Sequence, residues 1–147
     1  EVGAYFAIET GPETSAVLKR FLDSLGSSGV RVNLDPANLV MVTGDDPVEA
    51  VYNLKDYIVH THAKDGIMLR KSDPEVIYGM IEEEIQLGAA FKEVPLGEGS
   101  VNFIEYLRAL KSVGFNGFLT IEREVGENPE KDIRMAVEFL KKIMNKI

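Results

Sequence analysis

The feature that most constrains this fold is an alternation of short β-rich runs with helical patterns. Strands are predicted at Ala4–Thr10, Gly29–Asp35, Tyr57–His62 and Gly117–Arg123. Helices are predicted at Ser15–Leu25, Asp46–Tyr57, Asp73–Gly88, Asn102–Gly114 and Asn128–Ile147. This order predicts an α/β fold in which a parallel β-sheet is covered by helices. No Gly-x-Gly-x-x-Gly follows any strand into a helix, which disfavours a dinucleotide-binding fold.

Composition limits the classes of function. With 147 residues, 45% hydrophobic and 27% charged, residues 1–147 are expected to form one globular domain. The chain has no cysteine, so thiolate metal sites and disulfides are excluded. A net charge of −8 argues against nucleic acid as a partner. No apolar run approaches the roughly 18 residues that span a bilayer, and no signal peptide is evident. We therefore expect a cytoplasmic protein with no membrane partner.

The ends of the four strands carry possible metal ligands. Because residues two apart in a strand share a face, Glu9, Asp35, His62 and Glu122 lie on one side of the sheet, with His60 below His62. The opposite side is almost wholly apolar. The carboxyl ends of parallel strands meet at one rim, where active sites of such folds are built.

Each of these residues alone has a simpler explanation. Asp35 precedes Pro36 and suits a turn, and His60 suits a hydrogen-bonded interior position. Together, three carboxylates at one rim would repel each other unless a cation or a proton offsets their charge. Three carboxylates with one imidazole suit Mn²⁺, Mg²⁺, Co²⁺ or Zn²⁺, and the set does not choose among them.

Four ordered motifs carry a resemblance to a known family: "AIET", "VNLDPANL", "HTHAKDG" and "VPLGEGSVNFIEYLRALKSVGFNGFLTIERE". The chain resembles the C-terminal half of the sugar phosphate isomerase/epimerase family, which has a xylose isomerase-like (β/α)₈ TIM barrel. By this resemblance the strands are strands five to eight of the barrel. The resemblance implies one divalent metal ion held by Glu9, Asp35, His62 and Glu122.

The family's chemistry implies an enzyme that isomerises or epimerises a sugar, or a related polyol or keto compound, by proton transfer through an enediolate. Glu9 and Glu122 would act as acid and base. Asn38, His60, Lys64 and Asp65 are assigned to the substrate or to the shell behind the ligands.

The resemblance does not extend to one known substrate. The family's keto-sugar 3-epimerases carry glutamate, histidine and arginine where this chain has Ser15, Asn38 and Met68. All three positions depart, so a keto-hexose is not supported. The turn "PLGEGS" is expected to border the substrate mouth, and Gly97→Val to reduce turnover more than stability.

A complete barrel of this kind takes roughly 250 residues, so the chain is interpreted as half a barrel and part of a longer protein. Its outer strands would have unpaired edges, and Ala7, Ile58 and Phe118 would be exposed on the inner face. A homodimer, or association with the missing half, is therefore expected. Two other functions stay open: a metal-dependent phosphodiesterase of the apurinic endonuclease type, and an inactive metal-binding fragment.

Overall fold

The computed structural model describes residues 3–82 and 88–147. The strands are β1 (Phe6–Glu9), β2 (Val30–Leu34), β3 (Ile58–Ala63), β4 (Asp65–Met68), β5 (Phe91–Val94) and β6 (Leu119–Ile121). The helices are α1 (Ser15–Leu25), α2 (Pro36–Asn38), α3 (Pro47–Leu54), α4 (Pro74–Ile77), α5 (Phe103–Ser112) and α6 (Pro129–Met144), with a π-helix, η1, at Leu39–Thr43.

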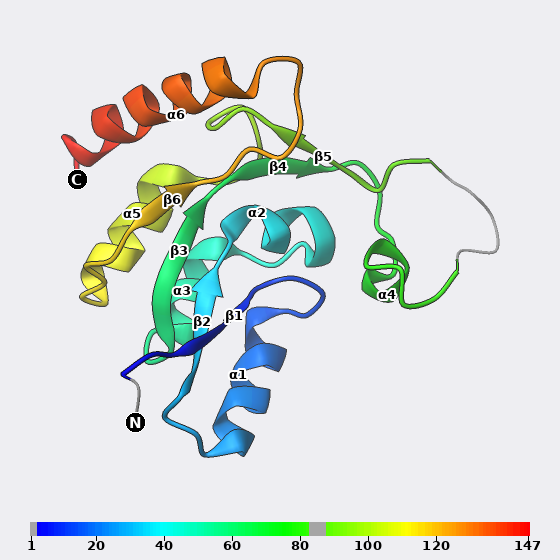
Figure 1. Ribbon diagram of the computed structural model, residues 1–147, viewed down its shortest axis with the longest axis vertical. Coiled ribbons are helices and arrows are strands. Elements are labelled where there is room, and N and C mark those ends of the chain that lie inside the picture. Colours follow the sequence, from blue (N-terminus) through cyan, green and yellow to red (C-terminus); the bar gives the residue numbers. More distant parts are fainter. Residues whose placement is uncertain (1–2, 83–87) are drawn as a thin grey trace.

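The main sheet has four parallel strands in the order β1-β2-β3-β6. Each crossover passes through helical segments, and the strands run toward the same rim of the sheet (Figure 1). This confirms the predicted parallel α/β fold. Among the described residues, β1 and β6 each keep one unpaired edge, as the half-barrel interpretation requires.

Helices cover one side of the sheet and create the core there. Helices α1, α3 and α5 pack side by side along the sheet, and α6 lies over β6 and α5 (Figure 1). The core joins apolar residues of β2 and β3 to those of the helices, and includes Leu18, Val32, Leu34, Val51 and Tyr106. These side chains are almost fully buried, so the helical side supplies the hydrophobic stabilisation of the fold.

A two-stranded antiparallel hairpin, β4 and β5, extends β3 beyond the sheet and was not predicted. After β3 the chain passes through Lys64 and continues directly into β4. The stretch that begins with the apolar residues of β3 and continues into charged residues therefore contains two strands. The strand β5 has only four residues, "FKEV", which give little periodic signal.

The helix predicted over Asp73–Gly88 is wrong for most of the described part. The structure has only the single turn of α4, Pro74–Ile77, after the N-cap Asp73. Gly79 adopts a left-handed conformation, with φ of +68°, which ends the helix there. Residues 83–87 of the predicted helix lie outside the described residues.

An irregularity in the pairing of β2 with β3 changes which side chains lie on the inner face of the sheet. Val32 pairs with Ile58, but Asn33 pairs with His60, so the register shifts by one residue at Val59. Ile58 therefore packs against the core on the helical side, contrary to the prediction. Phe118 is 78% exposed, as expected. No helix among the described residues is long and apolar enough to cross a bilayer.

Candidate metal centre

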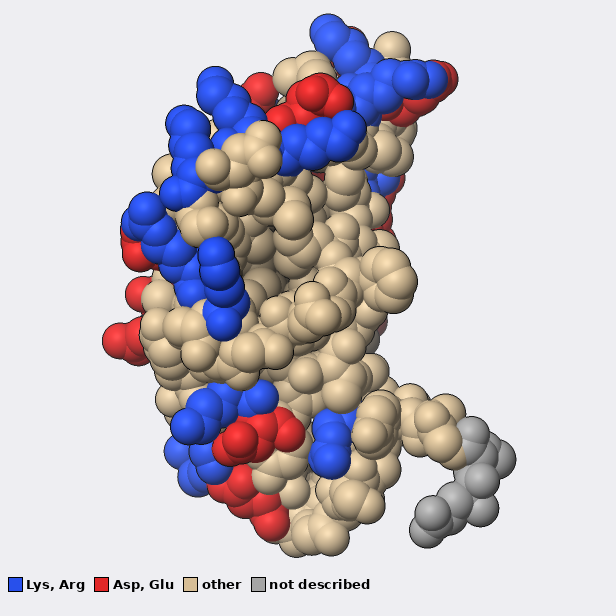
Figure 2. All heavy atoms as spheres, turned by 90° about the vertical axis from the view of Figure 1, so that its left-hand side faces the viewer, with Lys and Arg blue, Asp and Glu red and all other residues tan. Residues whose placement is uncertain are grey.

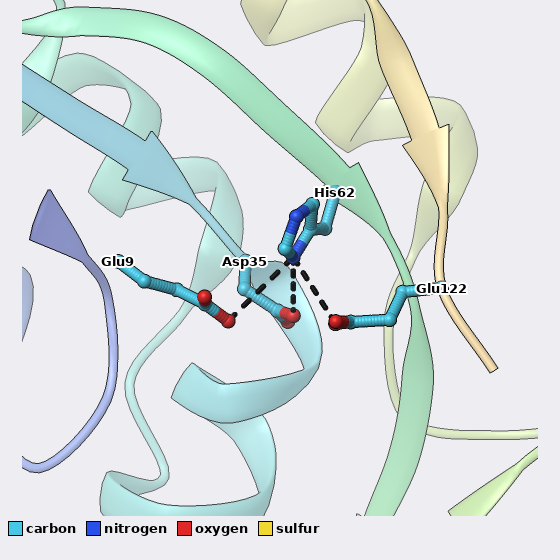
Figure 3. A group of neighbouring side chains, drawn as sticks. All are labelled: Glu9, Asp35, His62 and Glu122. Carbon is cyan, nitrogen blue, oxygen red and sulfur yellow. Dashed lines mark hydrogen bonds and ion pairs between the residues drawn. The ribbon is translucent and has the colours of Figure 1, made fainter. Parts of the chain in front are cut away.

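Four side chains converge at the rim of the sheet (Figure 3). They come from the end of β1 (Glu9), the residue after β2 (Asp35), the fifth position of β3 (His62) and the residue after β6 (Glu122). Each offers one ligand atom, and these atoms lie within 4.8 Å of one another. The structure thus brings together the residues that the sequence placed on one face.

The histidine faces all three carboxylates through the same nitrogen. His62 Nδ1 lies 3.5 Å from Glu9 Oε1, 3.2 Å from Asp35 Oδ2 and 3.1 Å from Glu122 Oε2. Hydrogen bonds to Asp35 and Glu9, together with the charge of Glu122, raise the pKa of His62 to about 10, although partial burial opposes this. In the metal-free chain, a proton on His62 therefore offsets part of the negative charge of the cluster.

Asp35 is fully buried and uses its two carboxylate oxygens differently. Oδ1 accepts hydrogen bonds from the backbone N–H groups of Ala37 and Asn38, which caps α2, while Oδ2 faces His62. The Thr10 hydroxyl donates to the Asp35 carbonyl and accepts from the Asp35 N–H. The turn role and the ligand position, which the sequence presented as alternatives, thus coexist in one residue.

Asn33 is a site residue that the sequence reasoning missed. Its side-chain Nδ2 lies 3.2 Å from His62 Nε2, while among the described residues its buried Oδ1 has no hydrogen-bond partner. A 180° rotation of the amide places Oδ1 where it accepts from Nε2–H. This hydrogen bond keeps a proton on Nε2, so that His62 would coordinate a metal ion through Nδ1 once the Nδ1 proton has left. The signal was available, because Asn33 lies two residues before Asp35 on the same face.

Glu122 sits between His62 and the buried Lys64. Its Oε2 lies 3.1 Å from Lys64 Nζ and 3.1 Å from His62 Nδ1, yet neither approach has the angles of a hydrogen bond to it among the described residues. Burial raises the pKa of Glu122, and the charges of Lys64 and His62 oppose that effect. A buried carboxylate oxygen that faces two cationic groups, beside two further carboxylates, has the donor chemistry for coordinating a cation.

Lys64 has only 5% of its surface exposed and is held by acidic neighbours. Its Nζ lies 2.6 Å from Glu124 Oε2 and 3.9 Å from Glu93 Oε2, in addition to the contact with Glu122. Burial opposes the charge, but the Glu124 hydrogen bond and the charges of Asp35 and Glu122 raise its pKa overall. Arg123 bridges Glu93 and Asp132, at 2.8 Å each, and so ties this cluster to α6.

Of the other residues assigned from the sequence, Asn38 and His60 lie beside the four side chains, whereas Asp65 does not. Asn38 donates to Glu9 Oε1 at 3.1 Å and to the Thr10 carbonyl at 3.0 Å, so it orients a ligand carboxylate. His60 lies one layer below, edge-on to the His62 ring, with Nε2 2.8 Å from Thr120 Oγ1. Asp65 points away from the cluster and toward the turn that includes "PLGEGS".

Asp65 anchors that turn through both carboxylate oxygens. It accepts hydrogen bonds from the backbone N–H groups of Gly66, Gly97, Gly99 and Val101. A Cβ at Gly97, where φ is +89°, would collide with Phe139 of α6. The turn therefore packs on α6 rather than lining the cleft at the four side chains. This gives Gly97→Val a structural cost, and the expectation that turnover would suffer more than stability stays a prediction.

Parallel strands with helices on one side, and acidic and imidazole groups converging at the carboxyl ends, define the ligand-bearing part of a β/α-barrel enzyme fold. The family model described as "xylose isomerase-like TIM barrel" matches residues 1–143. The chain belongs to this family, which confirms the resemblance read from its motifs.

The chain is also similar to individual proteins. It is 27% identical over 143 residues to an inosose dehydratase of Lacticaseibacillus casei, covering 92% of this chain and 45% of that protein. A crystal structure of a xylose isomerase domain protein from Planctomyces limnophilus matches with a TM-score of 0.76 and 29% identity, covering 99% of this chain and 46% of that one. A D-tagatose 3-epimerase-like protein shares the fold, with a TM-score of 0.66, 24% identity and coverages of 98% and 49%. The chain thus spans about half the length of these relatives.

Proposed function

We propose that the protein is a divalent-metal-dependent isomerase or epimerase of a sugar or a related polyol or keto compound. The observation that carries this proposal is the convergence of Glu9, Asp35, His62 and Glu122. A divalent cation held by these four residues supplies stabilisation of the negative charge that develops on substrate oxygens. The ligand set accepts Mn²⁺, Mg²⁺, Co²⁺ or Zn²⁺.

The two glutamates have the chemistry for the proton transfers. One carboxylate removes the proton from the carbon beside the substrate carbonyl, and the electron pair moves to the C–C bond and onto the carbonyl oxygen, giving an enediolate. Return of a proton to the same carbon from the other face gives epimerisation. Return to the former carbonyl carbon gives isomerisation when the neighbouring hydroxyl also passes its proton to the former carbonyl oxygen and becomes the new carbonyl. Burial raises the pKa of Glu122, which brings it closer to the range where a carboxylate exchanges protons efficiently.

Dehydration is a second candidate, supported by the similarity to an inosose dehydratase. It shares the first step, abstraction of a proton beside the carbonyl. The electron pair then expels a hydroxyl group from the next carbon, which leaves as water after protonation by a carboxylic acid. The phosphodiesterase alternative has less support, since sites of that type hold several metal ions with many histidines and this chain has two.

Deuterium exchange tests the proposal, since all these reactions break the same C–H bond. The complete natural gene product, loaded with Mn²⁺, would be incubated in D₂O with D-fructose, D-tagatose and 2-keto-myo-inositol. We expect loss of the ¹H signal beside the carbonyl of at least one compound. Glu122→Gln and Glu9→Gln should each slow this exchange by about 10²-fold or more, because each removes a proton-transfer group.

Glu138→Gln, at an exposed position of α6, is the matched control and should leave the exchange rate unchanged. Tight metal binding with no exchange into any of the three compounds, and no elimination product, would favour the inactive metal-binding alternative. Exchange that is as fast in Glu9→Gln and Glu122→Gln as in the wild-type protein would contradict the roles assigned to these two residues.

We also propose that the open sheet is completed by further parallel βα units, which a second copy supplies when the 147-residue chain is alone. The edges of β1 and β6 are unpaired among the described residues, and Tyr5, Phe6 and Phe118 are 58%, 72% and 78% exposed. Figure 2 shows that uncharged residues fill the middle of the face that includes the start of β1, with charged residues above and below. Sedimentation at micromolar concentration should give a dimeric mass; a monomeric mass with a cooperative melt would contradict this.

A further inference from the structure

A lysine, Lys64, is buried beside the candidate metal centre although it is not one of the proposed ligands. It follows His62 by two positions, at the junction of β3 and β4, and only 6% of its side chain is exposed. Its ammonium group faces the carboxylates of Glu124 at 2.6 Å, Glu122 at 3.1 Å and Glu93 at 3.9 Å. Burying a positive charge is costly unless such partners surround it, so this position is built to hold a cation.

One carboxylate oxygen is shared between this cation and the candidate metal centre. Glu122 Oε2 lies 3.1 Å from Lys64 Nζ and 3.1 Å from His62 Nδ1. In enzymes that hold a pair of divalent ions, the two ions lie roughly 3.5–4 Å apart. Lys64 Nζ therefore takes the place of the second ion of such a pair, with oxygens of Glu93 and Glu124 as further ligands. All four side chains line a cleft of about 400 Å³, so a metal ion can reach this place.

The charges at the rim also suit one divalent ion together with one ammonium group. A divalent ion offsets two of the three ligand carboxylates, and Lys64 offsets the remaining one. Glu93 has a partner of its own, because its Oε1 accepts a hydrogen bond from Arg123 at 2.8 Å. A second divalent ion beside Lys64 would be repelled by the ammonium group at short range.

We propose that Lys64 is a positioning residue that acts as a built-in cation: its ammonium group holds Glu122 beside the metal centre and occupies the place of a second metal ion. The chain then binds a single divalent ion. This inference rests on the proposed function, because it requires a metal ion at Glu122 and its neighbouring ligands. It also gives a physical reason to disfavour the phosphodiesterase alternative, since paired metal ions are the arrangement that stabilises both the attacking and the leaving oxygen in such hydrolysis.

Metal stoichiometry tests this role without depending on turnover. The complete natural gene product and its Lys64→Ala and Lys64→Arg variants would be titrated with Mn²⁺ and followed by calorimetry and electron paramagnetic resonance. We expect one Mn²⁺ per chain in the wild-type protein and in Lys64→Arg, which keeps the positive charge. Lys64→Ala should bind two Mn²⁺ per chain, with the spectrum of an exchange-coupled pair, because Glu93, Glu122 and Glu124 then lack their cation.

Arg123→Ala is the matched control. Arg123 is also a buried cation, with 9% of its side chain exposed, and it lies 2.8 Å from both Glu93 and Asp132, neither of which belongs to the candidate metal centre. Its loss should lower stability and leave one Mn²⁺ per chain. If Lys64→Ala does not fold even with Mn²⁺ present, the double variant with Glu93→Gln, which removes one buried charge of each sign, is titrated in its place and should also bind two ions.

One Mn²⁺ per chain in the folded variant that lacks Lys64, or two in the wild-type protein, would overturn the proposal. A second ion in Arg123→Ala would overturn it as well, because the extra ion would then follow from the loss of any buried cation. Failure of the proposed function gives a different pattern. One ion in the wild-type protein and two in Lys64→Ala, without deuterium exchange into any compound, would contradict the proposed function and support this inference.

Discussion

Replacing His62 with alanine should lower the affinity of the chain for Mn²⁺ or Zn²⁺ by about 100-fold or more. His62 Nδ1 is the point where the three carboxylates meet, at 3.1 to 3.5 Å, and it supplies the only nitrogen ligand of the described cluster. Metal titrations followed by calorimetry measure the loss directly.

Variants of two neighbouring residues should lower the metal affinity less than His62→Ala does. Asn33→Leu should weaken metal binding about tenfold, because the His62 ring loses the partner that fixes its tautomer. His60→Ala should weaken it least, since His60 contacts the His62 ring only edge-on. An His60→Ala variant that loses more affinity than His62→Ala would refute the assignment of His62 as the ligand.

The same titration has a defined pH dependence. The proton on the metal-free His62, with its pKa raised to about 10, must leave when a metal binds, so affinity should rise with pH up to about 10. The folding stability of the metal-free chain should change with pH in the opposite direction to the metal affinity. The protonated histidine contributes its full stabilisation below the unfolded pKa near 6.5, and this is lost as pH rises through about 10.

Replacing Asp65 with alanine should reduce the free energy of unfolding by about 3–5 kcal/mol. Asp65 is 1% exposed and accepts four backbone hydrogen bonds, from Gly66, Gly97, Gly99 and Val101. Its removal leaves several buried N–H groups without acceptors and opens a cavity beside the turn. Burial raises the pKa of Asp65, and the four backbone donors oppose this rise because they stabilise the charged carboxylate. Denaturant unfolding measures the change.

Asp73→Ala provides a matched control, because Asp73 is exposed and accepts a single backbone hydrogen bond, from Glu75, as the N-cap of α4. It should cost about 1 kcal/mol. Gly99→Ala should be as damaging as Asp65→Ala, since a Cβ there would overlap the Asp65 carboxylate. A loss under 1 kcal/mol in both Asp65→Ala and Gly99→Ala would show that the turn is not anchored in this way.

The parallel sheet was predictable from the alternation of strands with helices, and the meeting of four side chains from the alternation of faces along each strand. Glu9, Asp35, His62 and Glu122 each lie at or within one residue of the carboxyl end of a strand, and parallel strands align their ends. That argument needs no knowledge of loops. It fails where a strand departs from regular pairing, as at Val59, where the shifted register turns Ile58 toward the helices.

What the sequence could not predict depends on contacts between distant segments. The hairpin of β4 and β5 pairs Asp65 with Val94, which lie 29 positions apart in the sequence, and no local pattern specifies such a pairing. The sequence also could not distinguish the role of Lys64 from that of its neighbour Asp65. Lys64 contacts Glu122 and Glu124, whereas Asp65 binds the turn at Gly97–Val101.

The stretch from Thr61 to Asp65 serves three parts of the molecule within five residues. Thr61 bonds to the Phe118 carbonyl, His62 and Lys64 contact Glu122, and Asp65 holds the turn. Because neighbouring side chains point to opposite faces, inserting or deleting a single residue here would exchange all of these assignments at once. Insertions and deletions that arise between relatives are therefore expected in the loops on either side of this stretch and not within it.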